Sequence, residues 1–180
     1  FLFGGSQGSA YLNKMMNKIV PNLSNAGIQV IWQTGELEYN RYKMMNSDSV
    51  RVVPFVNNMD DAYAVSDLLI CRSGALTLAE ITVCGKPSIL VPFPHAAGDH
   101  QTKNAKVLVD AGAARMFLEK SLNSTDMLHA IMNLIHDKKE LDKILIRENR
   151  FKLAQECFDF IKARVDLDLS GWNEQDIFKH

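Results

Sequence analysis

Glycines and hydroxyl residues gather directly after an apolar stretch at the start of the chain. The run GGSQGS at residues 4–9 follows three apolar residues and precedes a helical pattern. Glycines let backbone amides approach a ligand closely, and a helix N-terminus adds unpaired N–H groups and a partial positive charge. The run therefore suits a phosphate, with Ser6 as a further donor. A tight turn in which Ser6 or Ser9 caps the helix is the alternative. NAD or ATP binding is weakly supported, because the run has neither GxGxxG spacing nor a Walker lysine.

A second run, RSGALTLAE at residues 72–80, also lies between an apolar stretch and a helical pattern. We expect Ser73 and Gly74 to begin a helix whose free amides point into the same cleft. Glu80 lies about one and a half turns into that helix, where its carboxylate could accept two hydrogen bonds from a ribose diol. The alternative is a glutamate on an exposed helix face.

The third run is a long loop at residues 92–101 that contains two histidines. Asp99 or His100 could cap the helix that follows, and Gln101 offers both a donor and an acceptor to a sugar hydroxyl. His95, Asp99 and His100 could together bind a metal ion, but no fourth ligand is evident. A catalytic histidine is an alternative, but nothing near these residues resembles a nucleophile with an orienting partner.

An aromatic residue follows the third predicted strand, within the run PFVNNM at residues 54–59. Phe55 could stack on or flank a base. An aromatic in this place is also typical of a hydrophobic core, and the pattern alone leaves both readings open.

These runs are joined by alternating short apolar segments and helical patterns. Strands are predicted at residues 1–3, 28–32, 50–53, 68–71, 88–91 and 114–118, and helices at 9–25, 36–46, 58–65, 75–84, 100–111, 124–136 and 138–164. This alternation predicts an α/β fold, a Rossmann-like doubly wound parallel sheet with helices on both faces. Ligands bind beyond the carboxyl ends of such strands, where the runs above are expected to meet.

The composition indicates one globular domain. The chain has 180 residues, of which 47% are hydrophobic and 23% charged, and its formal net charge is −1. This balance argues against a general nucleic-acid binder, which carries a basic excess. No apolar run approaches the roughly 20 residues that span a bilayer, and no signal peptide is visible. Cys71, Cys84 and Cys157 form no CxxC pair and are interpreted as reduced, core-type cysteines.

Taken in order, the four runs GGSQG, FVNNM, RSGALTLAE and VPFPHAAGDHQTKNA resemble the C-terminal domain of the MurG family. These enzymes are the UDP-N-acetylglucosamine:undecaprenyl-pyrophosphoryl-muramoyl-pentapeptide N-acetylglucosaminyltransferases of peptidoglycan synthesis. The likeness extends from residue 1 to about residue 160. It implies one half of a GT-B glycosyltransferase, in which two Rossmann-like domains enclose the active site.

The resemblance assigns roles by position. Ser6 matches the serine that contacts the diphosphate region, and the backbone of Val56 matches the position that recognises uracil. The amides of Ala75 and Leu76 would face phosphate, Glu80 would hold the ribose hydroxyls, and Gln101 would read the N-acetylglucosamine hydroxyls. The complete set of implied substrate-binding residues is Ser6, Gln7, Phe55, Val56, Arg72, Ala75, Leu76, Thr77, Leu78, Ala79, Glu80, His100 and Gln101.

The resemblance also implies the reaction, an inverting transfer of N-acetylglucosamine from UDP-N-acetylglucosamine to lipid I, giving lipid II, with no metal or cofactor. The acceptor site, the membrane-contacting patch and the catalytic base are expected in an N-terminal domain absent from these 180 residues. The complete enzyme would be peripheral on the cytoplasmic face of the membrane.

The chain itself is expected to begin inside a domain, to bind donor over residues 1–165, and to be inactive alone. Residues 166–180 are predicted as a tail, either disordered or used for docking. The alternatives are a donor-binding subunit of a split glycosyltransferase and a non-catalytic UDP-binding domain.

Overall fold

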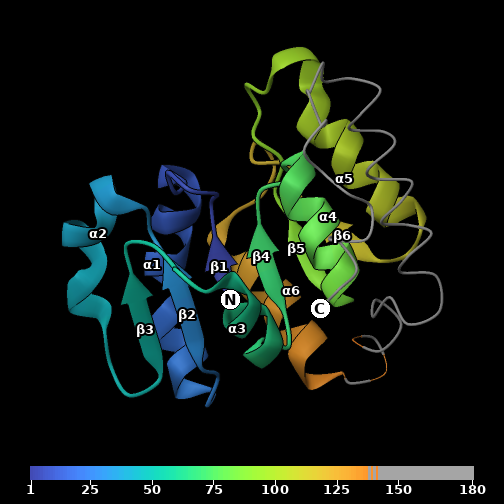
Figure 1. The fold of residues 1–180 in the computed structure, drawn as a ribbon. Helices are drawn as coiled ribbons and strands as arrows, with labels where there is room; N and C mark the ends of the chain where they lie inside the picture. The colour runs from blue at the N-terminus through green and yellow to red at the C-terminus, as the bar shows by residue number, and fades with distance from the viewer. Residues whose placement is uncertain (138, 140, 142–180) are drawn as a thin grey trace.

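The computed structural model describes residues 1–137, 139 and 141, in which six parallel strands form one sheet. The strands are β1 (Leu2–Phe3), β2 (Val30–Gln33), β3 (Val50–Val53), β4 (Leu69–Cys71), β5 (Ser88–Leu90) and β6 (Ala114–Met116). Their order in the sheet is β3-β2-β1-β4-β5-β6 (Figure 1). The chain thus starts in the middle, builds outward to one edge, and then crosses over to build the other half. This order confirms the doubly wound, Rossmann-like prediction, and its switch point lies between β1 and β4.

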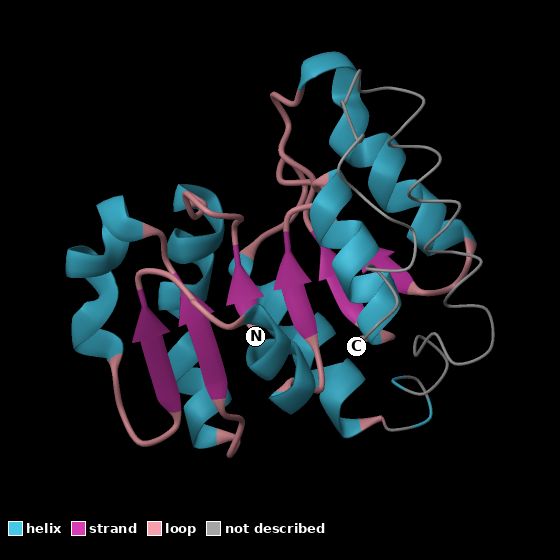
Figure 2. Cartoon of the chain, in the orientation of Figure 1, coloured by secondary structure: helices cyan, strands magenta, loops and turns pink. Residues whose placement is uncertain are grey.

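Helices cover both faces of the sheet. The α-helices are α1 (Ala10–Asn25), α2 (Glu36–Tyr42), α3 (Met59–Val65), α4 (Ala75–Cys84), α5 (His100–Asp110) and α6 (Ser124–His136), and short 3-10 helices lie at η1 (Lys43–Met45) and η2 (Ala97–Asp99). Helices α1 and α6 pack together behind the sheet as drawn, and α3, α4 and α5 lie in front of it (Figures 1 and 2). No helix among the described residues is long and apolar enough to cross a bilayer.

Alternation along the short strands divides the core between the two faces. Leu2 and Ile70 pack with the residues of α1 and α6, whereas Phe3, Leu69 and Cys71 pack with those of α3, α4 and α5. Strands buried on both faces need apolar residues at every position, which explains why these segments read as continuous apolar runs. Cys71 is fully buried, as expected of a core cysteine, and burial raises the pKa of its thiol to about 12.

The boundaries of the described elements lie within two residues of those predicted, and three details differ. The strand predicted at 28–32 is shifted to Val30–Gln33, and the helix predicted at 36–46 is divided into α2 and η1. The predicted cap of α5 is wrong: Asp99 stands at the N-cap position, but its side chain makes no capping hydrogen bond and its φ is +54°. The helix predicted at 138–164, the tail at 166–180 and Cys157 lie outside the described residues, which include only 139 and 141 of these segments.

Two loops at the carboxyl edge of the sheet touch through their backbones. A Cβ atom on Gly35 would lie 2.2 Å from the carbonyl oxygen of Gln7, and one on Gly8 would lie 2.0 Å from that of Thr34. Both glycines also have positive φ, +81° and +79°. The loop after β2 therefore supports the glycine-rich loop after β1, and any side chain at these positions would separate the two.

We expect Gly35→Ala to destabilise the domain more than Gly27→Ala does. Gly27 has a similar φ of +76°, and a Cβ atom added to it would meet no atom within 4 Å, so Gly27→Ala carries only a backbone cost, about 1–2 kcal/mol. Gly35 has in addition a ψ of 152°, and this combination of angles is adopted almost only by glycine. Displacing the loop at Gly35 should add about 1–3 kcal/mol. Urea unfolding followed by circular dichroism measures both variants. Equal losses of unfolding free energy would show that the two loops do not depend on their close contact.

Candidate functional site

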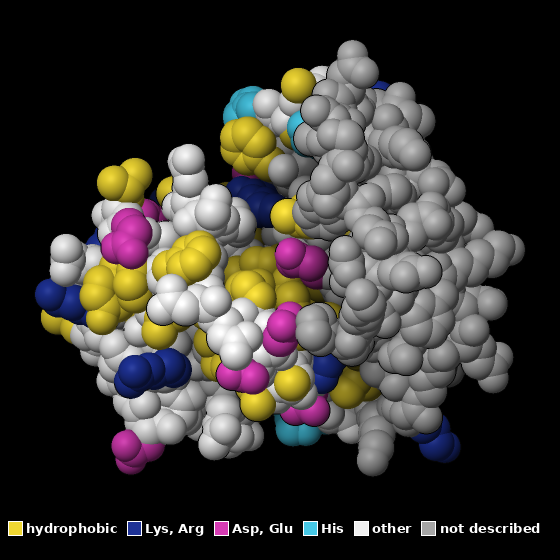
Figure 3. Space-filling model, in the orientation of Figure 1, with side chains coloured by type: hydrophobic (Ala, Val, Ile, Leu, Met, Phe, Trp, Pro, Cys, Tyr) yellow, Lys and Arg dark blue, Asp and Glu magenta, His cyan; other side chains and the backbone are white. Residues whose placement is uncertain are grey.

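The runs picked out in the sequence meet at one edge of the sheet. All six strands are parallel, so the segments that leave their carboxyl ends lie together above the arrowheads of Figure 2. The surface is notched at this edge, between the part that carries α2 and the taller part that carries the start of α5 (Figure 3). The glycine-rich loop (residues 4–9) and the segment that begins α4 (residues 72–74) flank the switch point, the place where open α/β sheets bind ligands.

The buried guanidinium of Arg72 ties several of these segments together. It donates to the carbonyl oxygens of Val91 at 3.0 Å and Pro92 at 3.2 Å, and to the hydroxyl of Ser9 at 2.7 Å. It is paired with the carboxylate of Glu119, which lies between β6 and α6. The ring of Phe93 lies 5.5 Å from the guanidinium carbon, within reach of a cation–π contact. In this arrangement Arg72 joins protein segments, and its contribution to a ligand site is to hold them in place.

A second set of contacts fixes the start of α5 against the start of α4. The hydroxyl of Ser73 donates to the carbonyl oxygen of Gln101 at 2.8 Å, and the amide of Asn104 donates to the carbonyl oxygen of Ser73 at 3.1 Å. The side-chain oxygen of Gln101 accepts from the backbone N–H of Phe93 at 3.0 Å. This contact occupies the acceptor end of the Gln101 amide and leaves its NH₂ group as the end that can serve a ligand.

The N-termini of α1 and α4 differ in how they are capped. Helix α1 has Ser9 as its N-cap, whose hydroxyl accepts from the N–H of Leu12. Ser9, not Ser6, therefore fills the capping role. Helix α4 begins after Gly74, and no side chain caps it. The first amides of α4, including those of Ala75 and Leu76, consequently have no side-chain partner, and they carry the positive end of the helix dipole.

A buried tyrosine holds one oxygen of the Glu80 carboxylate in place. The hydroxyl of Tyr63 donates to Oε2 of Glu80 at 2.7 Å. Burial of the ring, and then the hydrogen bond to this carboxylate, raise the pKa of Tyr63, so that its hydroxyl remains a donor. Glu80 is half-buried, so it is not the freely exposed glutamate that the alternative reading described. One of its oxygens is fixed, and the other has acceptor capacity to spare.

The loop after β3 exposes an aromatic ring. Phe55 is 44% exposed, so the alternative reading of a core aromatic is wrong. The neighbouring N–H of Val56 donates to Oε1 of Gln33 at 2.9 Å, while Nε2 of Gln33 donates to the carbonyl oxygen of Gly5 at 3.0 Å. The amide proton of Val56 is thus already bound within the protein.

The remaining predicted residues are placed as follows. The side chains of Ser6 and Gln7 are exposed, and Leu76 is 61% exposed. Leu78 is buried in the core, so that only its backbone could reach a ligand. Thr77 and Ala79 are half-buried on α4, and the exposed His100 has its Nδ1 2.8 Å from the carbonyl oxygen of Ala97.

Sequence reasoning missed three polar residues that organise this edge: Gln33, Asn104 and Glu119. Gln33 and Asn104 are 2% and 5% exposed. Each bonds to groups that lie far away in the chain, so no local spacing revealed the contacts. The one available signal was position, since Gln33 and Glu119 closely follow apolar strand residues.

Metal chemistry receives no support from the described part of the chain. It contains no group of three or more His, Cys, Asp or Glu side chains that could hold a metal ion. His95, which had suggested one, is exposed and packs edge-on against Phe93, with 5.6 Å between ring centroids.

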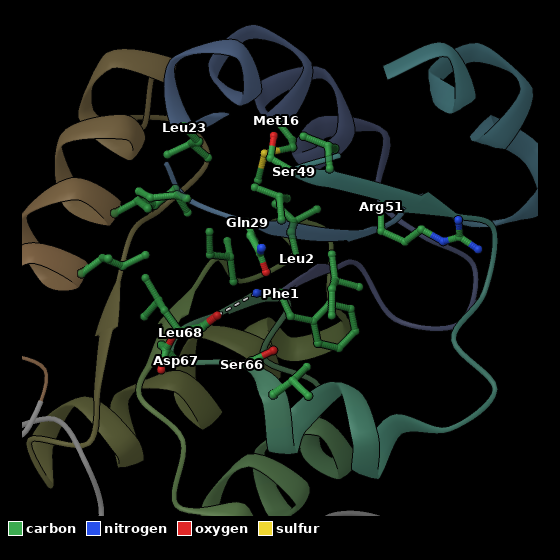
Figure 4. A pocket seen from close by; sticks show the side chains of 18 of the residues that line it. Phe1, Leu2, Met16, Leu23, Gln29, Ser49, Arg51, Ser66, Asp67 and Leu68 are labelled. Carbon is green, nitrogen blue, oxygen red and sulfur yellow. Dashed lines mark hydrogen bonds between the residues drawn. The ribbon is translucent and has the colours of Figure 1, made fainter. Parts of the chain in front are cut away.

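A cavity of about 620 Å³ lies at the opposite, amino end of the strands. Figure 4 shows Gln29, Arg51 and Asp67 around it, and the amino group of Phe1 donating to the carbonyl oxygen of Leu68 at 2.8 Å. None of the predicted site residues lines this cavity. The cavity is therefore distinct from the predicted site.

Comparisons with known proteins show the family to which the chain belongs. Residues 1–156 match the glycosyltransferase family 28 C-terminal domain. A protein of Chlorobium phaeobacteroides is 42% identical over 139 residues, and one of Trichlorobacter lovleyi is 40% identical over 177 residues. Both are named UDP-N-acetylglucosamine--N-acetylmuramyl-(pentapeptide) pyrophosphoryl-undecaprenol N-acetylglucosamine transferase. The two matches cover 76% and 95% of this chain but only 38% and 45% of the relatives, so the chain spans less than half of their length.

A solved structure gives the same answer. The crystal structure of Acinetobacter baumannii MurG matches 90% of this chain with a TM-score of 0.66 and 28% sequence identity, and the match covers 51% of that protein. The motif-based resemblance to the C-terminal domain of MurG is thereby confirmed. The chain belongs to glycosyltransferase family 28, whose C-terminal domain it matches over residues 1–156.

Proposed function

We propose that this domain binds UDP-N-acetylglucosamine and forms the donor half of an enzyme that transfers N-acetylglucosamine to lipid I, giving lipid II. The observation that carries the proposal is the uncapped N-terminus of α4, beside the glycine-rich loop at the switch point of the sheet. Unpaired amides at a helix N-terminus favour a phosphate group. The names of the relatives support the choice of sugar and acceptor.

In the proposed reaction the C4 hydroxyl of the muramoyl sugar attacks the anomeric carbon of the donor, and UDP leaves from the opposite face. The bond between the anomeric carbon and the diphosphate oxygen breaks, so negative charge grows on the diphosphate. Amides of Ala75 and Leu76, with those of the loop that contains Ser6 and Gln7, would stabilise this charge from fixed positions, as an oxyanion hole does. No proton-transfer step is assigned to the described residues, since the base belongs to the proposed acceptor half.

The other predicted residues would orient the donor. Glu80 would accept from the ribose hydroxyls with the oxygen that Tyr63 leaves free, and Gln101 would donate its NH₂ group to a sugar hydroxyl. Phe55 would flank the uracil beside the backbone of Val56. The rest of the set, Arg72, Thr77, Leu78, Ala79 and His100, would shape the walls or, as in Arg72, hold the loops.

The acceptor site, the catalytic base and contact with the membrane would come from the part of the protein that the relatives contain and this chain does not match. We propose that the complete enzyme works at the cytoplasmic face of the membrane, where lipid I would be its partner. The isolated chain would bind donor without turnover.

Replacing Glu80 with glutamine should weaken nucleotide binding. Glutamine keeps an oxygen that can accept from Tyr63, but it removes the charge that strengthens hydrogen bonds from ribose. Losing such bonds costs about 1.5–3 kcal/mol, so we expect roughly 10- to 100-fold weaker binding of both UDP and UDP-N-acetylglucosamine by isothermal titration calorimetry.

Asp110→Asn is the matched control, because Asp110 is an exposed carboxylate at the far end of α5. Its affinity for both nucleotides should stay unchanged. The ribose role of Glu80 would be refuted by a Glu80→Gln chain that binds UDP as tightly as the unchanged chain.

Replacing Gln101 with glutamate should reduce the preference of the domain for UDP-N-acetylglucosamine over UDP. Glutamate can still accept from the N–H of Phe93, but it has no NH₂ group for the sugar. The added carboxylate repels the diphosphate of both ligands, so we expect some loss of affinity for each. The ratio of affinities, UDP-N-acetylglucosamine over UDP, should fall in addition by about tenfold, the equivalent of one lost hydrogen bond.

The same titrations include UDP-glucose as a second sugar nucleotide, for comparison with UDP-N-acetylglucosamine. An equal loss of affinity for UDP and for the sugar nucleotides would place Gln101 outside the sugar site.

A further inference from the structure

Gln33 joins the glycine-rich loop to the loop that carries Phe55. Its Nε2 donates to the carbonyl oxygen of Gly5 at 3.0 Å, and its Oε1 accepts from the N–H of Val56 at 2.9 Å. These two loops follow different strands and are separated by about fifty residues of chain. One side chain thus sets the spacing between them.

The sheet register explains why this residue can reach both loops. Gln33 is the last residue of β2, which lies between β1 and β3, and it is paired with Phe3 on one side and Val53 on the other. The two loops begin shortly after those partners. A side chain that leaves the carboxyl end of the middle strand therefore stands between the two loops that flank it.

The bridge uses both ends of the amide. Gly5 offers a carbonyl oxygen, which only accepts, and Val56 offers an N–H, which only donates. Only one orientation of the Gln33 amide satisfies both, so the assignment of its oxygen and nitrogen follows from its partners. The residue is 2% exposed, so water does not offer these backbone groups an easy substitute.

We propose that Gln33 is a positioning residue for donor binding. It holds the loop that carries Phe55 (residues 54–58, the base loop) at a fixed distance from the glycine-rich loop, so that one nucleoside diphosphate can contact both. The inference rests on the proposed function. A ligand that spans two sites binds more tightly when the sites are already correctly spaced, because ordering them costs nothing at the moment of binding. Ligands that touch one loop gain little from the spacing.

The first test compares ligands that span the loops with ligands that do not. The 180-residue chain is titrated with UDP-N-acetylglucosamine, uridine and inorganic pyrophosphate, before and after Gln33→Leu. We expect the variant to lose roughly tenfold or more in affinity for UDP-N-acetylglucosamine, and less than about threefold for uridine and for pyrophosphate.

The second test uses pH to restore the bridge. A protonated glutamate in Gln33→Glu can donate from its O–H to Gly5 and accept from Val56, as the amide does. Burial and the facing carbonyl oxygen of Gly5 would raise the pKa of this carboxyl above its usual range. The bridge is then present at low pH and is lost as pH rises through that raised pKa.

We therefore expect Gln33→Glu to bind the sugar nucleotide at least as weakly as Gln33→Leu at about pH 7.5, where its carboxylate also repels the diphosphate, and to return to within about threefold of the unchanged chain, and so above Gln33→Leu, at about pH 5. Affinity is expressed relative to the unchanged chain at each pH. The sugar nucleotide is the suitable ligand, since both of its phosphates are esterified and neither titrates in this range.

Asn13→Asp is the matched control. Asn13 is also a buried amide, 1% exposed, that donates to the carbonyl oxygen of Thr34 and to the carboxylate of Glu38 and accepts from Trp32, but it does not touch the base loop. Both acid variants should unfold more easily at pH 7.5. Selective loss of UDP-N-acetylglucosamine affinity, with recovery at low pH, is expected only for Gln33→Glu.

Three results would overturn the inference: unchanged or increased affinity of Gln33→Leu for the sugar nucleotide, equal losses for all three ligands, or the same selective loss in Asn13→Asp. An increase would mean that Gln33 competes with the ligand for the Val56 amide. Failure of the unchanged chain to bind UDP-N-acetylglucosamine would instead contradict the proposed function, and this inference with it.

Discussion

The buried charge of Arg72 is the constraint on which the carboxyl edge depends. A guanidinium removed from water is costly unless its donors and its charge are satisfied. Here the partners come from the N-cap of α1, the end of β5 and the segment between β6 and α6. Because these partners are far apart in the chain, Arg72 is satisfied only when all of them are in place. Helix α4 starts three residues later, at Ala75, so its N-terminus is fixed by the same contacts.

This constraint separates the roles of the two helices at the switch point. The hydroxyl of Ser9 both caps α1 and accepts from Arg72, so the first turn of α1 is partly occupied with protein contacts. Helix α4 has glycine at its N-cap and no side chain over its first amides. An anion would gain more at α4, because there it replaces water rather than an existing cap. The glycine-rich loop would then add its amides and the hydroxyl of Ser6 from the other side.

The sequence predicted the elements well and the connections between loops poorly, for one physical reason. Helices and strands can be predicted from local signals, such as the apolar period of α6 and Gly85, which ends α4 in a left-handed conformation. The side-chain hydrogen bonds of Gln33 and Glu119 are with groups 23 to 47 residues away. Their residue types fit ordinary loop and strand ends, so only the folded sheet reveals which backbone groups they meet.

Arg72 and Gln33, the two buried side chains that join loops at this edge, differ in charge. This difference affects how an anionic ligand would bind. Arg72 is neutralised by Glu119, so the pair adds little net charge to the edge. Gln33 is neutral and satisfies one acceptor and one donor without a counter-ion. A carboxylate at Gln33 would repel a diphosphate, and a lysine would offer no acceptor to Val56. Because Gln33 is neutral and the charge of Arg72 is paired, the attraction for a phosphate would come mainly from backbone amides and helix N-termini. The two side chains fix the positions of these groups, whose dipoles would need no reorganisation when charge develops on a leaving group.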